Sequence, residues 1–376
     1  MIAAISYSLL QEYWWAIISL LGALLVFLMF VQGGQSLLFT IGKTEMQRTM
    51  LVNSLGRKWE FTFTTLVTFG GAFFASFPLF YATSFGGAYW VWMLILFSFI
   101  LQAVSYEFRS KPSNFLGAKT YEVFLIINGL MGTILIGTAV GTFFNGAQFS
   151  LNDYNQVNWE TGARGLEAVL NIHNISLGLS VFFLTRVLAL QYFNNSIDDN
   201  EIALRVRMQM WVNAIPFLAF FLFFIGALFL KEGYAFDPST MEVFTEKYKY
   251  MNNLLQMPLL FVLFMLGVLL VLWGIFSDLF FKPGKGIWYS GAGTVVTVFV
   301  LFLIAGYNNT CYYPSAFDLQ SSLTIRNSSS SEFTLGVMAI VSIMVPFVAA
   351  YIWVAWKAIN KKKIDENEMN EGGHKY

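Results

Sequence analysis

Nine apolar stretches of membrane-spanning length run through the 376 residues of this chain. Each holds about the 20 apolar residues that a helix needs to cross the hydrocarbon core, where every backbone polar group must be paired internally. The sequence therefore predicts an all-α membrane protein that forms a single polytopic domain over residues 1–376. The predicted transmembrane helices are 14–41, 59–82, 87–104, 122–145, 166–192, 211–230, 255–281, 287–306 and 333–356.

The loops between these stretches carry their positive charge almost entirely on one side. When the loops are assigned to alternate sides, all but five of the 22 Lys and Arg residues fall on one side. By the positive-inside rule that side is cytoplasmic, so the N-terminus is predicted outside and the C-terminus inside. A helix missed in the middle of the chain would exchange the sides of all later loops, so the bias favours nine helices. The five residues on the outer side are Arg164, Lys231, Lys247, Lys249 and Arg326.

Composition agrees with a polytopic membrane protein and narrows its chemistry. Hydrophobic residues make up 57% of the chain and charged residues 12%, about half of the roughly 25% usual in soluble domains. Trp and Tyr gather near the predicted helix ends, for example at Trp14, Trp15 and Trp288, as in an interfacial aromatic belt. The single cysteine, Cys311, excludes an intramolecular disulfide and a CxxCH haem attachment within the chain. Nothing in the composition indicates a nucleic-acid partner, and none is predicted.

The longest connections fall on the predicted outer side, at 146–165, 231–254 and 307–332. The last of these contains Pro314 and a run of four serines, which is typical of an irregular surface loop. On the predicted cytoplasmic side, the polar tail 361–376 is expected to be mobile, as polar chain ends commonly are.

Ionisable side chains inside a membrane are costly, so their positions matter more than their number. Most charges here stand at predicted helix ends, where a long side chain can reach the interface. Glu107, Glu122 and Asp278 all fit that interpretation.

Glu60 is the carboxylate with the strongest claim to a function. It follows Trp59 at the cytoplasmic mouth of the second predicted helix, roughly ten residues from the bilayer midplane at about 1.5 Å per residue. A carboxylate there could take protons from the cytoplasm and pass them inward. The alternative is that Glu60 only pairs with the preceding cations, Arg57 and Lys58.

His173 lies within the fifth predicted helix and could ligate haem or a metal, but a histidine satisfied by hydrogen bonds inside a bundle is the better interpretation. The pair Gly33 and Gly34, flanked by Gln32 and Gln35, favours close approach of another helix. No phosphate-binding glycine loop, nucleophile–base pair or HExxH motif is present. No catalytic or metal-binding residue is therefore assigned, and the chain is predicted to be a helical scaffold without its own catalytic centre.

Three groups of motifs nevertheless match one known pattern in order and spacing, and together they span the chain. The motifs are NSLGRKWE at 53–60 running into FGGAFFASFPLFYA at 69–82, YEFRSK at 106–111, and YPS at 313–315 with SLT at 322–324 and SSEFTL at 330–335. They resemble subunit II of cytochrome bd-type quinol oxidases.

The resemblance implies a heterodimer in a bacterial cytoplasmic membrane. The partner, subunit I, would carry haem b and haem d (or b in place of d) and would oxidise quinol at the outer face while reducing dioxygen to water. The protons would come from the cytoplasm, which generates proton-motive force without a pump. Subunit II would have two four-helix bundles and one peripheral helix, bind no haem, support assembly and contribute to proton uptake. A small single-helix accessory subunit and a structural quinone or lipid also occur among relatives.

The resemblance also implies site residues. Glu60, preceded by Trp59, matches the acidic residue that the family is thought to use in proton uptake, and Glu107 of the second motif is a further candidate. The chain departs from the family where relatives have acids late in the first helix, since it has Gln32 and Gln35 there. This chain also has FTFTT at 61–65 where the family has G-N-x-V-W, and QAVS at 102–105 where the family has R-P-V-G. The proton route therefore either runs differently or depends less on Glu60.

Two other classes of function compete with the oxidase. A secondary transporter would show helices broken by Gly or Pro with charged residues near the midplane. Only His173 lies deep in a predicted helix, so this alternative is weak. A structural scaffold that binds a partner without handling protons is not separable from an oxidase subunit by sequence.

Overall fold

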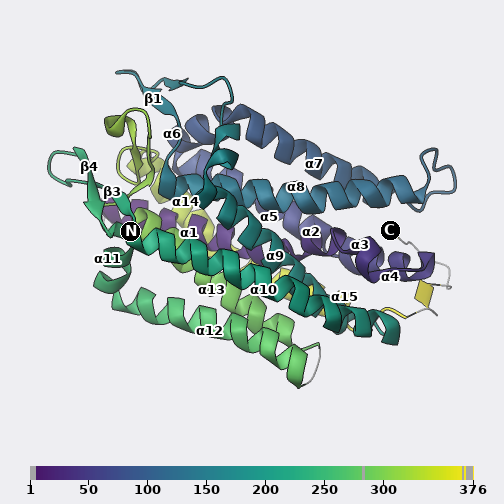
Figure 1. The fold of residues 1–376 in the computed structure, drawn as a ribbon. Coiled ribbons are helices and arrows are strands. Elements are labelled where there is room, and N and C mark those ends of the chain that lie inside the picture. Colours follow the sequence, from purple (N-terminus) through teal and green to yellow (C-terminus); the bar gives the residue numbers. More distant parts are fainter. Residues whose placement is uncertain (1–5, 282–283, 366–367, 370–375) are drawn as a thin grey trace.

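The computed structural model describes residues 6–281, 284–365, 368–369 and 376. Most of the chain is helical, and the long helices run side by side along one axis (Figure 1). The α-helices are α1 Tyr7–Leu28, α2 Phe30–Gln35, α3 Leu38–Ile41, α4 Glu45–Gly56, α5 Trp59–Ser76, α6 Pro78–Phe80, α7 Tyr89–Phe108, α8 Ala118–Asn145, α9 Ile172–Ser196, α10 Asn200–Leu230, α11 Lys249–Gln256, α12 Pro258–Phe280, α13 Gly286–Gly306, α14 Glu332–Val341 and α15 Val345–Ile359.

Within the described ranges, eight helices are long and apolar enough to cross a membrane, and a ninth is reached only if one bent pair counts as a span. The bent pair contains the predicted helix 59–82. Its first part, α4 and α5, ends at Ser76, and the chain turns by 118° into Pro78–Gly86. Pro78 has no N–H to continue the helix and its ring clashes with the preceding turn. The predicted helix 59–82 is therefore interrupted at Phe77.

Several helix ends also differ from the prediction, because capping extends a helix beyond its apolar part. α1 begins at Tyr7 after the N-cap Ser6, well before residue 14. α10 begins at Asn200, where the Asp199 side chain accepts the N–H of Ile202, so the turns before residue 211 are helical. A hydropathy pattern detects only the apolar part of a helix, and the first turns of α1 and α10 contain polar residues.

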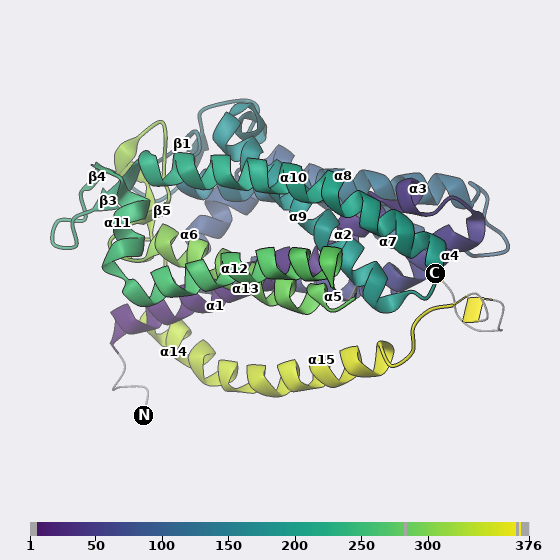
Figure 2. The same ribbon diagram turned by 60° about the horizontal axis from the view of Figure 1, so that its bottom comes forward.

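Close helix packing at the predicted glycine pair is confirmed. A Cβ on Gly33 would collide with the backbone of Thr185 in α9, and one on Gly34 would press on Leu55 and Phe193. The pairs α8–α9, α9–α10 and α12–α13 pack along their lengths, and α1 packs against α13 and α5. α14 and α15 lie along one edge of the bundle with most of their surface exposed (Figure 2).

The three long connections fold into antiparallel hairpins, although the sequence analysis expected the last of them, 307–332, to be an irregular surface loop. The hairpins lie at the end of the bundle where α1 begins (Figure 1). Tyr312 and Tyr313 of the last hairpin are fully buried in the core, so this loop is a packed cap. The paired strands are β1 Phe149–Leu151 with β2 Val157–Trp159, β3 Glu232–Phe236 with β4 Val243–Lys247, and β5 Cys311–Tyr313 with β6 Leu323–Thr324.

The described residues of the tail are packed against the bundle at the opposite end. The Ile364 N–H donates to Ser196 O at 2.8 Å, and the Asp198 N–H donates to Ile364 O at 2.9 Å. Glu368 forms an ion pair with Arg57. These residues of the tail, which was expected to be mobile, thus contact the bundle, and 366–367 and 370–375 lie outside the described part of the chain.

Candidate functional site

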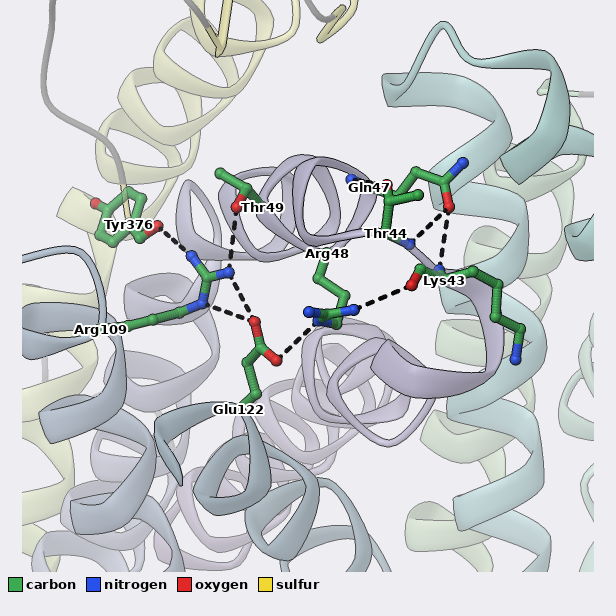
Figure 3. Close-up of polar contacts among 8 residues, drawn as sticks. All are labelled: Lys43, Thr44, Gln47, Arg48, Thr49, Arg109, Glu122 and Tyr376. Carbon is green, nitrogen blue, oxygen red and sulfur yellow. Dashed lines mark hydrogen bonds and ion pairs between the residues drawn. The ribbon is translucent and has the colours of Figure 1, made fainter. Parts of the chain in front are cut away.

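A buried carboxylate lies at the end of the bundle opposite the hairpins and organises the contacts there (Figure 3). Glu122, in the first turns of α8, is only 1% exposed. Arg48 Nε of α4 donates to Glu122 Oε2 at 2.9 Å, and Arg109 Nη2, just after α7, donates to Oε1 at 2.7 Å. The prediction that Glu122 reaches the membrane interface is wrong. A carboxylate can be buried here because two guanidinium groups neutralise and hydrogen-bond it.

The two arginines extend this cluster to other elements. Arg109 Nη2 also donates to Thr49 Oγ1 at 3.2 Å, and Arg109 Nη1 donates to the main-chain oxygen of Tyr376 at 3.3 Å. Arg48 Nη1 donates to Lys43 O at 3.3 Å. The cluster therefore ties α4, α7, α8 and the tail together.

Arg48 is positioned by the start of α4. Thr44 and Gln47 form a capping box there: the Gln47 N–H donates to Thr44 Oγ1 at 3.1 Å, and Gln47 Oε1 accepts the N–H of Thr44 (Figure 3). This arrangement fixes the first turn of the helix. Arg48 follows in that turn and faces Glu122.

Glu60 stands exposed in the first turn of α5 at the same end of the molecule. The alternative that it pairs with its neighbouring cations is not what the structure shows. Arg57 pairs with Glu368, and Lys58 is fully buried with Nζ 4.2 Å from the ring centroid of Trp356. Among the described residues Glu60 has no ion pair.

A crevice of about 650 Å³ between α5 and α15 opens at Glu60. Thr64 and Thr65 lie one turn further along α5 and line it with Ile352 of the peripheral helix. The carboxylate thus stands at the polar end of a crevice that continues along the helix.

Behind Glu60 lies a chain of aromatic and amide side chains. The Trp59 ring stacks on Tyr106 with centroids 5.7 Å apart and an interplanar angle of 16°. Gln35 Nε2 donates to Tyr106 Oη at 3.0 Å and to Gln102 Oε1 at 2.8 Å, and Gln32 Nε2 donates to the same oxygen at 2.6 Å. The structure thus brings together Gln32, Gln35 and Gln102, which are three of the residues at which this chain departs from the family. The sequence analysis did not predict this contact.

This cluster of three glutamines is fully buried yet incompletely hydrogen-bonded. The Oε1 atoms of Gln32 and Gln35 and the Nε2 of Gln102 have no partner within the described protein. Each buried polar group left in that condition costs about 1–3 kcal/mol. Polar groups of this kind are where buried water is normally found in proteins.

The structure does not bring Glu107 into this chain of contacts. Its side chain is 58% exposed and pairs with Lys111 one turn later at 3.0 Å, as expected for an interfacial residue. Asp278, for which the same was expected, is instead buried. Its Oδ1 accepts the N–H groups of Gly284 at 3.1 Å and Gly286 at 2.9 Å, so it fixes the turn between α12 and α13.

His173, near the outer end of α9, is satisfied by hydrogen bonds, as the sequence analysis preferred. Its Nε2 lies 3.0 Å from Phe224 O, which can only accept, so Nε2 carries a proton. Lys231 Nζ donates to Asn145 Oδ1 at 2.5 Å, which orients the Asn145 amide so that its Nδ2 donates to His173 Nδ1 at 2.8 Å. Both ring nitrogens are engaged, and the imidazole is neutral. Burial lowers the pKa of Lys231 to about 8.

A metal ion finds no set of ligands in the part of the chain that the structure describes. No group of three or more His, Cys, Asp or Glu side chains is close enough to hold a metal ion there. The buried polar residues around Glu122 instead form ion pairs and hydrogen bonds.

The chain is similar to known proteins over nearly its whole length. Cytochrome bd-I ubiquinol oxidase subunit 2 of Escherichia coli (strain K12) is 27% identical, over 97% of this chain and 98% of that protein. Cytochrome bd ubiquinol oxidase subunit 2 of Bacillus subtilis (strain 168) is 25% identical, over 87% of this chain and 88% of that protein. A chain of the bd oxidase from Geobacillus thermodenitrificans shares the fold, with a TM-score of 0.59 and 9% identity over 93% of this chain and 98% of that chain.

The family model of cytochrome bd terminal oxidase subunit II matches residues 10–359. This match covers the bent pair of helices, the glutamine cluster and all three hairpins. The resemblance drawn from the motifs is therefore confirmed, and the chain belongs to the cytochrome bd terminal oxidase subunit II family.

Proposed function

We propose that this chain is the haem-free subunit II of a terminal quinol oxidase that reduces dioxygen to water. The match to the family over residues 10–359 carries this proposal. Haem b and haem d (or b) would then reside in subunit I, to which this chain binds and whose assembly it supports. The geometry of His173 favours this division, because hydrogen bonds engage both of its ring nitrogens and leave neither for iron.

We further propose that Glu60 takes up protons from the cytoplasm. Its carboxylate is exposed, lacks an ion pair among the described residues and stands at the mouth of a crevice. The Trp59–Tyr106 stack and the glutamine cluster lead inward from it. Neutral amides do not take up protons near neutral pH, so water between them would conduct the proton where relatives have acids. Glu107 would serve only as a surface acceptor at the same end.

The charge bias of the loops supports a topology with the N-terminus outside and the C-terminus in the cytoplasm of a bacterium. The hairpins would then face the outer side, and the arginine–glutamate cluster would face the cytoplasm. In this assignment α14 and α15 are the peripheral helix, and the remaining transmembrane helices form two four-helix bundles.

An apolar cavity of about 280 Å³ between α1, α9, α10, α12 and α13 supports a structural quinone or lipid. Its walls are almost entirely aliphatic and aromatic. Thr294 and Thr297 line it with buried hydroxyls that have no partner within the described protein. They would donate to a carbonyl oxygen of such a molecule.

The proposed function is tested by purifying the tagged chain in mild detergent from a host that expresses its natural partners. The expected result is co-purification of a second large membrane subunit, with haem bands in the reduced-minus-oxidised spectrum and quinol-dependent oxygen uptake. A single-helix accessory subunit would appear as an additional small band. A colourless chain that purifies alone would contradict the oxidase and favour a transporter.

A further inference from the structure

The Tyr376 ring packs closely against its neighbours at the proposed cytoplasmic end of the bundle. Its ring packs on Gly56, where an added Cβ would lie 2.5 Å from the ring carbon Cγ. The same ring meets Tyr106 edge to face, with centroids 5.7 Å apart and an interplanar angle of 84°. Tyr376 therefore covers one side of the tyrosine that hydrogen-bonds the glutamine cluster.

The backbone of Tyr376 is held from two sides. Its N–H donates to Asn53 Oδ1 at 3.1 Å, and its main-chain oxygen accepts from Arg109 Nη1 at 3.3 Å. Asn53 and Arg109 are themselves buried, and Arg109 is fixed by its ion pair with Glu122. The position of the ring is therefore set by the buried cluster.

We propose that Tyr376 is a positioning residue of proton uptake, whose ring shields Tyr106 so that cytoplasmic water reaches the glutamine cluster by way of Glu60. This inference rests on the proposed role of Glu60. It adds that the route is selective because a side chain of the tail closes the alternative path over Tyr106.

The charges around Tyr376 keep its ring neutral. Burial raises the pKa of its hydroxyl, and the carboxylates of Glu60 and Glu107 raise it further, while Arg57 acts in the opposite direction. Arg109 faces its main-chain oxygen. The hydroxyl therefore stays protonated at neutral pH, and the shielding resides in the ring.

The first test measures access of water to the cluster in the complex with subunit I, in inside-out membrane vesicles. A cysteine replaces Gln35 in a Cys311→Ser background and is labelled with a cationic, water-soluble methanethiosulfonate. Tyr376→Ala is expected to speed labelling by about tenfold, because it opens the cover locally. Tyr376→Phe, which keeps the ring, is expected to retain the slow rate. Equal rates in the Ala and Phe variants would overturn the inference.

Two further variants test whether the change in labelling rate is specific to the ring of Tyr376. Gly56→Ala leaves Tyr376 in the chain but forces its ring away, so it should also speed labelling. Tyr351→Ala removes a tyrosine of α15 that is 74% exposed and should leave the rate unchanged. Faster labelling in Tyr351→Ala would show general loosening and would contradict a specific role for Tyr376.

The second test measures quinol-driven oxygen uptake with Glu60→Gln in two backgrounds. The loss caused by Glu60→Gln should shrink in Tyr376→Ala, because water then reaches the cluster without Glu60. An equal loss in both backgrounds overturns the inference and leaves the role of Glu60 intact. No loss in either background refutes the role of Glu60, and with it the selective route, whereas the labelling rates still report whether Tyr376 shields the cluster.

Discussion

The two ends of the helix bundle treat polar side chains differently. At the end with the hairpins, the buried His173 and the half-buried Asn145 and Lys231 satisfy one another and nearby carbonyl groups. At the opposite end, the buried Gln32, Gln35 and Gln102 share hydrogen bonds but leave three polar atoms without a partner in the described protein.

This difference in hydrogen bonding distinguishes the His173 network, which is structural, from the glutamine cluster, which can admit water. A fully satisfied buried network rigidifies its surroundings and has no need of water. A partly satisfied one is stabilised by each water that enters it. The hairpins cover the first network, whereas the second lies behind an exposed carboxylate. The end that carries Glu60 is therefore the one for which we propose proton uptake.

The largest effect is expected at the ion cluster that supports the cytoplasmic network. Glu122→Gln leaves two largely buried guanidinium groups without a counter-charge, which should destabilise the protein by about 3–5 kcal/mol. Thermal unfolding of the purified complex and its yield would measure this loss. Glu107→Gln is the matched control, since an exposed pair contributes about 1 kcal/mol or less. Similar melting temperatures for the two variants would refute a central role for Glu122.

A smaller loss is expected in the outer network. Lys231→Met removes a charged donor that bonds Phe144 O and Asn145 Oδ1, and hydrogen bonds to a charged group contribute about 1.5–3 kcal/mol. Thermal unfolding should register this change, while oxygen uptake per assembled complex should stay the same. Reduced uptake at full assembly would break the comparison, because the outer end would then take part in turnover.

A variant at Glu60, in front of the glutamine cluster, is expected to change activity, whereas the Lys231 variant is expected to change stability. Glu60→Gln is expected to lower quinol-driven oxygen uptake by about tenfold and to leave the haem spectrum unchanged. This is less than the roughly 10²–10⁴ of a direct catalytic acid, since water can partly replace a surface acceptor. Glu107→Gln again serves as control and should retain most of the activity. Unchanged oxygen uptake in Glu60→Gln would contradict a role of Glu60 in proton uptake and would favour a structural scaffold.

The smallest effect is expected at Cys311. Its thiol is fully buried in β5, and burial raises its pKa to about 12, so it stays protonated and unreactive at neutral pH. Cys311→Ser should cost about 1 kcal/mol for burying a hydroxyl in an apolar place. Thermal unfolding and oxygen uptake would both be measured. Loss of the complex would show that the outer hairpin requires the sulfur.

The helical class and the position of Glu60 could be predicted from sequence, because both depend on local runs of apolar residues and on the charges beside them. The partners of Glu122 could not. Arg48 and Arg109 come from different connections and meet Glu122 only after α4, α7 and α8 have packed. The available signal was a lone carboxylate at the start of an apolar stretch, with one arginine in the loop before it and another in the loop between the first two predicted helices.

The sequence by itself determined that the chain crosses a membrane many times, which family it resembles and which carboxylate stands at a helix mouth. These features follow from hydropathy, charge and short motifs, all of which act over a few residues. Only the tertiary structure decided that three glutamines share one buried cluster, that Lys58 is buried against Trp356 and that Tyr376 covers Tyr106. Such contacts join residues up to hundreds of positions apart, and their energies exist only once the helices have packed.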